Sequence, residues 1–276
     1  MSLAGLRVLT LESRKAKDME TLILREEGIP MVAPSVQERA HADNQVGVKF
    51  VEQLEADAYD MVILMTGVGL AFLRDIVIPE MPVERLSAAL SRATIVARGP
   101  KPVGVLRQLG LQTAIMIGEP NTWREIVTVV AKRQERRIAV QEYGRPNVEM
   151  NAALQQLGAT VTPIALYKWE MPDDLEPLRA AARALAKGDC DVVLFTSSIQ
   201  LDHLYEVASQ LGIRDEVEHA LRTNVAVASI GPVMTDALTA KRLPADVVPR
   251  HPKMWALVKA AGEQAREVLS AKRAAQ

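Results

Sequence analysis

Four pairs of similar segments recur at nearly one separation along the chain, and this internal repeat limits the possible folds more than any other feature. The separations, 129 to 132 residues, join RVLTLE at Arg7 to RIAVQE at Arg137, Pro34 to Pro163, DMVILMTGVGLAFL at Asp60 to DVVLFTSSIQLDHL at Asp191, and ARGPKPVGVL around Gly99 to SIGPVMTDAL around Gly231. Chance could produce one such match but hardly four in register. The chain therefore contains two copies of one structural unit.

Each copy is interrupted at the same place, after its second expected strand. The first interruption follows Gly28–Pro34, and the second runs through Gly158–Asp173, where Pro163 cannot donate a ladder hydrogen bond and Met171-Pro172-Asp173 breaks the chain. Two interruptions imply two domains joined by two strands, with the copies exchanging parts. We expect a discontinuous domain of residues 1–34 and 173–276, a continuous domain of residues 41–164, and linkers at 35–40 and 165–172.

Short β-branched runs alternate with longer amphipathic patterns, which is typical of α/β domains with parallel sheets. The expected strands are Arg7–Leu11, Ile29–Ala33, Met61–Met65, Thr94–Ala97, Gln112–Ile117, Arg137–Gln141, Ala159–Ile164, Asp191–Phe195, Val225–Ile230 and Val247-Val248. Helices are expected between them, and Pro100 and Pro232 each stand where a helix begins. The predicted fold is α/β, with two similar flavodoxin-like domains joined by two crossing linker strands.

The composition excludes several classes of protein. The 276 residues carry a net charge of −1 and no basic run, so we expect no nucleic-acid or membrane partner. No apolar stretch approaches the roughly 20 residues that cross a bilayer, and the start lacks the apolar core of a signal peptide, so the expected location is the cytoplasm. The single cysteine, Cys190, cannot form an internal disulfide and is expected to pack near a strand start. The histidines lack ligand spacing, so we expect no metal site: His41, His203, His219 and His251.

Several of these segments carry a resemblance to a known family. The strand end DVVLFTSS at Asp191–Ser198, the helix start Ile230-Gly231-Pro232 and the place of Tyr167 resemble those of the uroporphyrinogen-III synthases, and the split two-domain order is similar over most of the chain. The equivalent pieces of the other copy, Thr66–Gly69 and Arg98–Lys101, also fit.

Two positions depart from the pattern of that family. Its Gly-Pro is usually followed by two threonines, whereas here Val233 and Met234 precede Thr235. Its first strand commonly ends in Thr-Arg-Pro, for which Arg14 is only a loose counterpart.

The resemblance implies cyclisation of hydroxymethylbilane, a linear tetrapyrrole, to uroporphyrinogen III, with loss of water and inversion of ring D through a spiro intermediate. It also implies a monomer that uses no metal or organic cofactor. Loss of hydroxide creates a delocalised azafulvenium, so the enzyme contributes mostly positioning, with mild acid help for the departing hydroxyl. Tyr167, on the second linker, is the expected catalytic residue.

Positioning requires anion sites, because the substrate carries acetate and propionate groups while the chain is almost neutral. Five loops follow expected strand ends, where ligands bind in open parallel sheets. Helix starts there offer backbone N–H groups and dipoles worth roughly 0.3–1 kcal/mol each toward a carboxylate. The expected substrate-binding residues are Thr66, Gly67, Val68, Arg98, Gly99, Lys101, Tyr143, Gly144, Arg145, Thr196, Ser197, Ser198, Gly231, Pro232 and Val233.

Other interpretations of the same residues stay open. Ser197 and Ser198 can serve only as helix N-caps, and Tyr167 beside Trp169 can pack the linker against a domain. Gly67 and Gly69 form part of a G-x-G-x-x-G pattern, but Phe72 stands at the third glycine, which disfavours dinucleotide binding. The alternative function is a non-catalytic tetrapyrrole-binding or sensory module of the same fold, which Val233-Met234 modestly favours. A periplasmic-type solute receptor shares the two-lobe plan, but it fits poorly with the expected absence of a signal peptide.

Overall fold

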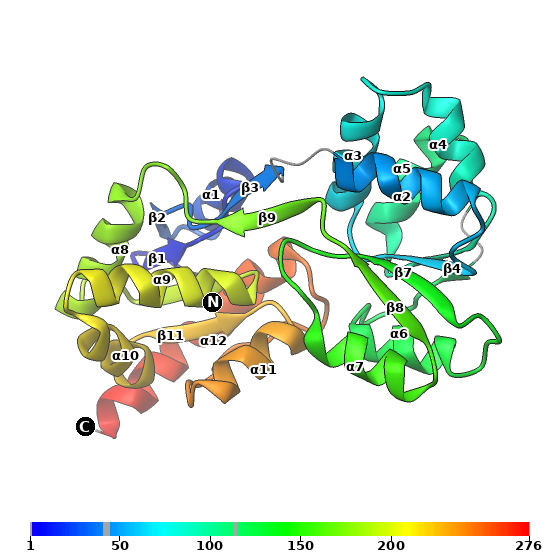
Figure 1. Ribbon diagram of the computed structural model, residues 1–276. Coiled ribbons are helices and arrows are strands. Elements are labelled where there is room, and N and C mark those ends of the chain that lie inside the picture. The colour runs from blue at the N-terminus through cyan, green and yellow to red at the C-terminus, as the bar shows by residue number, and fades with distance from the viewer. Residues whose placement is uncertain (1, 41–44, 113–114, 276) are drawn as a thin grey trace. The chain divides into compact units, whose positions relative to one another are not determined.

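The computed structural model describes residues 2–40, 45–112 and 115–275. His41 and the first residues of the predicted continuous domain lie outside these ranges, as do two residues of the expected strand Gln112–Ile117. Two units emerge from the contacts within the chain (Figure 1): unit 1 comprises Met1–Gln37 with Glu170–Gln276, and unit 2 comprises Glu38–Trp169. Within the described residues, no helix is both long and apolar enough to cross a membrane.

Unit 1 is built on a parallel sheet in the order β11-β10-β1-β2. Its strands are β1 (Arg7–Thr10), β2 (Ile29–Val32), β10 (Val192–Phe195) and β11 (Ala226–Ser229). A single parallel bridge from Ala228 to Val247 extends the sheet beyond β11, where Val247-Val248 was expected as a strand. If β1, β2, β10, β11 and the bridged residue Val247 are numbered 1 to 5, the order across the sheet is 2-1-3-4-5, which is the flavodoxin-like arrangement.

Helices cover both faces of this sheet, so its central strands are apolar throughout. In β10, Val192 and Leu194 pack with α1 (Ala16–Arg25) and α12 (Met254–Ala274), whereas Val193 and Phe195 pack on the opposite face. The helices of that second face are α8 (Glu176–Lys187), α9 (Ser198–Gln210), α10 (Arg214–Thr223) and α11 (Pro232–Ala240). Cys190 is 2% exposed in the same core, as predicted, and burial raises the pKa of its thiol to about 12.

Unit 2 repeats this plan with a parallel sheet in the order β6-β5-β4-β7-β8. The strands are β4 (Met61–Leu64), β5 (Thr94–Ala97), β6 (Ile115–Met116), β7 (Arg137–Gln141) and β8 (Thr160–Ile164). One face is covered by α2 (Gln45–Glu55), α3 (Gly67–Val77), α4 (Val83–Leu90) and α5 (Pro100–Gln108), and the other by α6 (Trp123–Val130) and α7 (Val148–Gln156). If β7, β8, β4, β5 and β6 are numbered 1 to 5, this sheet also has the order 2-1-3-4-5. The predicted α/β fold with two similar parallel-sheet domains is therefore confirmed.

The two chain segments between the units are extended. β3 (Gln37–Ala40) and β9 (Tyr167–Glu170) pair as a two-stranded sheet of their own. Tyr167 and Trp169 thus lie on a strand, because backbone pairing continues into the segment expected to act as a linker.

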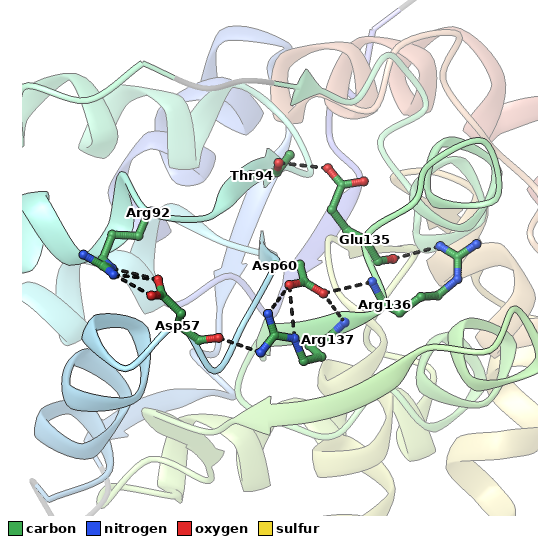
Figure 2. A network of polar contacts seen from close by, with 7 residues as sticks. All are labelled: Asp57, Asp60, Arg92, Thr94, Glu135, Arg136 and Arg137. Atoms are coloured by element: carbon green, nitrogen blue, oxygen red, sulfur yellow. Dashed lines mark hydrogen bonds and ion pairs between the residues drawn. The ribbon is translucent and has the colours of Figure 1, made fainter.

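At the amino-terminal edge of each sheet, an equivalent Arg–Asp ion pair joins the starts of two neighbouring strands. Asp191 accepts hydrogen bonds from the backbone N–H and the Nε of Arg7 at 2.8 and 3.0 Å, and Asp60 accepts the same two from Arg137 at 3.0 and 3.1 Å. Figure 2 shows the unit 2 version, in which Asp57 bridges Arg92 and Arg137. The hydrogen bond from Arg137 is the main cause that lowers the pKa of Asp60 to about 2. These residues stabilise the edge of each sheet that lies opposite the predicted ligand-binding loops.

Candidate functional site

Three of the predicted loops share the carboxyl edge of the unit 2 sheet. Thr66–Val68 follow β4, Arg98–Lys101 follow β5, and Tyr143–Arg145 follow β7, with β4 lying between the other two strands. The starts of α3 and α5 approach each other closely, because a Cβ added to Gly67 would lie 2.8 Å from the carbonyl oxygen of Lys101. Glycine at position 67 allows this approach.

Tyr167 joins this group of residues. Its phenol oxygen lies 3.2 Å from Oγ1 of Thr66, and Oγ1 also accepts the N–H of Gly69 at 2.9 Å. The ring of Tyr167 stacks on Phe72 with centroids 5.1 Å apart, and the residue is only 3% exposed. Helix α3 therefore holds both the ring and the hydroxyl of Tyr167. Phe72, which stands at the missing third glycine, supplies the stacking surface.

Arg98 is a half-buried cation beside two tyrosines. Its guanidinium carbon lies 5.4 Å from the centroid of the Tyr143 ring. Burial lowers the pKa of Arg98, and the nearby Tyr143 and Tyr167 partly oppose this effect. Among the described residues no carboxylate forms an ion pair with Arg98, unlike the arginines at the opposite edge. A half-buried guanidinium in aromatic surroundings favours an incoming carboxylate.

The loop that follows β7 packs against Trp169, the second aromatic residue of β9. The carbonyl of Gly144 accepts the N–H of Trp169 at 3.0 Å, and the rings of Tyr143 and Trp169 lie 5.6 Å apart. Gly144 has a φ of +67°, and an added Cβ would lie 2.5 Å from the indole. Only glycine suits both conditions. Arg145 is half-buried and Lys101 is exposed at the same edge.

The other two predicted loops belong to unit 1. Thr196–Ser198 follow β10, where the Thr196 hydroxyl donates to Glu12 at 2.6 Å. Gly231–Val233 follow β11, and Val233 is 43% exposed. Thr235, the nearest threonine in α11, has its hydroxyl 2.9 Å from that of buried Ser229. Next to Gly231-Pro232 the exposed side chain is therefore apolar, and the threonine hydroxyl is engaged within the protein.

Some of the backbone N–H groups expected to be free already have acceptors. In unit 1, Oε1 of Gln200 accepts the N–H groups of Thr196 and Ser197 at 2.8 and 3.2 Å. In unit 2, Oε1 of Gln141 accepts the N–H of Thr66 at 3.2 Å. The expectation was wrong for these donors, because buried backbone groups require partners within the fold.

The two glutamines reach equivalent places from different elements. Gln200 lies on α9 itself, and the position 131 residues earlier is Gly69. A Cβ on Gly69 would lie 1.8 Å from Nε2 of Gln141, so the absence of a side chain there makes room for an amide from β7. Sequence reasoning did not single out either glutamine. The pairing of Gly69 with Gln200 in the repeat is the signal that could have revealed them.

The described residues contain no cluster of three or more side chains suited to a metal ion. His41 lies outside those residues, and Nδ1 of His203 lies 2.6 Å from the carbonyl oxygen of Ser35, which is a structural contact.

One family model matches most of the chain. A family model described as uroporphyrinogen-III synthase HemD matches residues 17–259. Protein YjjA of Bacillus subtilis strain 168, described as uncharacterized, is 28% identical over 258 residues, covering 93% of this chain and 94% of its own length.

Solved structures show the same fold. A mutant uroporphyrinogen III synthase from the extremely thermophilic bacterium Thermus thermophilus aligns with a TM-score of 0.74 at 22% identity, covering 96% of this chain and all of its own. The uroporphyrinogen-III synthetase of Helicobacter pylori 26695 aligns with a TM-score of 0.55 at 12% identity, covering 93% of this chain and 98% of its own.

Proposed function

Because the chain belongs to the uroporphyrinogen-III synthase family, as its motifs predicted, we propose that it cyclises hydroxymethylbilane to uroporphyrinogen III. In this reaction hydroxide leaves the linear tetrapyrrole, and the substituted carbon of ring D attacks the resulting azafulvenium. The spiro intermediate then reopens and closes with ring D inverted. Without an enzyme, closure favours the uninverted isomer, so selectivity depends on how ring D is held.

Arg98 is the observation that carries the proposal beyond family membership. It is a cation without a carboxylate partner among the described residues, at the edge of the sheet where three loops meet. The substrate supplies several carboxylates on pyrrole rings. We propose that Arg98 binds one of them, and that the backbone N–H groups of Gly67, Val68 and Gly99 at the starts of α3 and α5 bind others.

Tyr167 is the proposed acid. Its phenol is protonated at neutral pH and can donate to the departing hydroxyl. The hydroxyl of Thr66 supports this role, because Oγ1 already accepts the N–H of Gly69 and can donate its own proton to the phenol oxygen. The unit 1 residues Thr196, Ser197, Ser198 and Gly231–Val233 are proposed as further substrate contacts.

The direct test is to supply freshly made hydroxymethylbilane and to resolve the cyclic products by isomer. We expect an excess of the inverted isomer over the enzyme-free reaction. Arg98→Gln should raise KM about 10- to 100-fold, since hydrogen bonds to charged groups contribute about 1.5–3 kcal/mol. Arg92→Gln is the matched control, because Arg92 pairs with Asp57 at the opposite edge. An unchanged isomer ratio would contradict the proposed reaction.

A second candidate is a non-catalytic tetrapyrrole-binding protein of the same fold. The observation that favours it is the helix start of α11, where Val233 is exposed and the hydroxyl of Thr235 contacts Ser229. Tight binding of the uninverted product without any change in isomer ratio would support this candidate.

A further inference from the structure

One buried corner of unit 2 contains polar atoms that the fold leaves unpaired. Glu142 follows β7 directly and is 5% exposed, and Asn147, the N-cap of α7, is 3% exposed. Oε1 of Glu142, Nδ2 of Asn147 and Oδ1 of Asn151 have no hydrogen-bond partner in the protein. Buried polar atoms are nearly always paired, with protein or with ordered water.

The three residues are joined through a single carboxyl group. The backbone N–H of Asn147 and the side-chain amide of Asn151 lie near the carboxyl group of Glu142, and each of them acts to lower its pKa. Oδ1 of Asn147 in turn accepts the N–H of Met150 at 3.1 Å. The three unpaired atoms therefore belong to neighbouring side chains in one corner of the unit.

The unpaired atoms comprise two acceptors and one donor. A water molecule complements this set, because its two protons can bond to Glu142 and Asn151 while its oxygen accepts from Asn147. An ammonium or metal cation cannot accept a hydrogen bond from Asn147. Burial raises the pKa of Glu142, but a proton on its carboxyl group would leave the amide of Asn147 without an acceptor. Water alone satisfies all three atoms.

The other copy of the repeat explains why a donor is lacking. Glu12 stands 130 residues before Glu142, and its carboxylate accepts the hydroxyl of Thr196 at 2.6 Å and the N–H of Lys15 at 3.3 Å. The residue 131 positions before Thr196 is Met65, which is 1% exposed and has no hydroxyl. Met65 therefore offers Glu142 no counterpart of the hydroxyl that Thr196 donates to Glu12.

We propose that Glu142, Asn147 and Asn151 hold one buried water molecule, and that this corner fixes the loop 143–146. That loop places Tyr143 beside Arg98 and Gly144 against Trp169. Glu142 is thus a positioning residue that acts through the loop without touching substrate. The effect on substrate rests on the proposed function, whereas the water site does not.

A crystal structure of the unmodified protein, at a resolution that shows ordered water, tests the site itself. We expect one water molecule within hydrogen-bond distance of the three atoms. The proposal is overturned if the site is dry, or if Glu142 bonds directly to Asn151 while Nδ2 of Asn147 stays unpaired.

Glu142→Gln tests the role of the corner in holding the loop. Hydrogen exchange at the backbone amides of residues 143–145 and 147 should become about 10- to 100-fold faster, because the loop loses a bond to a charged group. Amides within β7 should keep their exchange rates. Glu149→Gln is the matched control, since Glu149 is exposed in the first turn of α7. Unchanged exchange in the loop would overturn the positioning role.

Kinetics separate this inference from the proposed function. With hydroxymethylbilane, Glu142→Gln should raise KM several-fold and leave kcat near that of the unmodified protein, because a mispositioned loop weakens binding before chemistry. A several-fold fall in kcat with an unchanged KM would overturn the positioning role. If the unmodified protein shows no turnover, the proposed function fails, while the water and the exchange rates still decide the inference.

Discussion

At Tyr167 the ring and the hydroxyl make separate contacts, so their roles can be tested separately. The ring stacks on Phe72, and the phenol oxygen contacts Thr66. Tyr167→Phe keeps the stacking and removes the donor. Because the azafulvenium is stabilised by its own pyrroles, we expect a partial loss, about 10- to 100-fold in rate, or about 1.4–2.7 kcal/mol of barrier. The measurement is single-turnover kinetics with isomer analysis, and inversion should still dominate.

Tyr59→Phe is the control for this substitution. The phenol of Tyr59 donates to Gln53 at 2.8 Å in the same unit, away from the carboxyl edge of the sheet. Its removal should leave the rate unchanged. A wild-type rate for Tyr167→Phe, with chemistry shown to be rate-limiting, would leave Tyr167 as a packing residue.

Which residues lie close together was predictable from sequence where a motif names them, and not where the contact joins distant segments. The motif placed Tyr167, Thr66 and Arg98 in the site, and unit 2 brings these three together. Gln141 bonds to Thr66 across 75 positions, and nothing local marks it as the acceptor for a helix start. Glu142 stood in the matched segments RVLTLE and RIAVQE, but its burial follows from packing that no sequence pattern reveals.

At the scale of elements, the start of α3 depends on a side chain from β7. Gly69→Ala would place a Cβ where the amide of Gln141 lies. Thr66 would then lose the acceptor of its N–H, and we expect a loss of about 1–3 kcal/mol in the free energy of unfolding. Denaturant titration measures this change.

Gly104→Ala provides the matched control, because it lies within α5 and an added Cβ meets nothing within 4 Å. That substitution should stabilise the protein by up to about 1 kcal/mol. Equal effects of the two substitutions would show that Gln141 does not occupy the space beside Gly69.

The edge shown in Figure 2 predicts how stability changes with pH. The pKa of Asp60 is lowered to about 2, so its ionised form is favoured in the folded state. Its contribution is present above the ordinary pKa of an aspartate, about 3.9, and is lost as the pH falls toward 2. We expect Asp60→Asn to destabilise the protein at neutral pH and to flatten the acid dependence in this range.

Chemical denaturation at a series of pH values measures this dependence. Asp75→Asn is the control, because Asp75 pairs with Arg74 in an exposed position. If Asp60→Asn keeps the full slope of the unmodified protein below pH 4, groups other than Asp60 cause the acid sensitivity.

Strand positions were predictable because β4 and β10 are buried on both faces and read as continuous apolar runs. Val247-Val248 was overestimated as a strand, since only one bridge forms there. Two crossing linker strands were predicted, and β3 and β9 lie in those linkers, but no sequence pattern revealed that the two strands pair with each other.

For the whole molecule, the repeat predicted a chain that leaves one unit and later returns to it. Among the residues that the structure describes, the core clusters of unit 2 are formed by residues from Val46 to Trp169. We therefore expect a fragment of residues 38–169 to fold alone, with a cooperative transition and dispersed amide resonances. A fragment of residues 1–37 should remain unfolded, because β1 pairs with β10 at Val8 and Val192.

Mixing residues 1–37 with residues 170–276 supplies the complementary measurement. Together they contain every strand of the unit 1 sheet, so a complex should form that neither piece forms alone. A structureless 38–169 fragment would show that unit 2 depends on the rest of the chain. The predicted boundaries, 34 and 173, differ from the contact boundaries, 37 and 170, because the contacts assign the linker residues to the units and place most of β3 and β9 in unit 2.

The oxygen that accepts an N–H at the helix start comes from Gln200 in unit 1 and from Gln141, which fills the space beside Gly69, in unit 2. This difference has an evolutionary consequence. If the two copies arose by duplication, each kept an amide oxygen at the start of its helix while the residue supplying it changed. A mutational path between the two arrangements passes through a protein with two amides competing for one space, or with none. The two substitutions are therefore epistatic, each tolerated mainly in the presence of the other. Descendants of such a duplication can diverge at both positions without losing the shared geometry, which hides their common origin from residue-by-residue comparison.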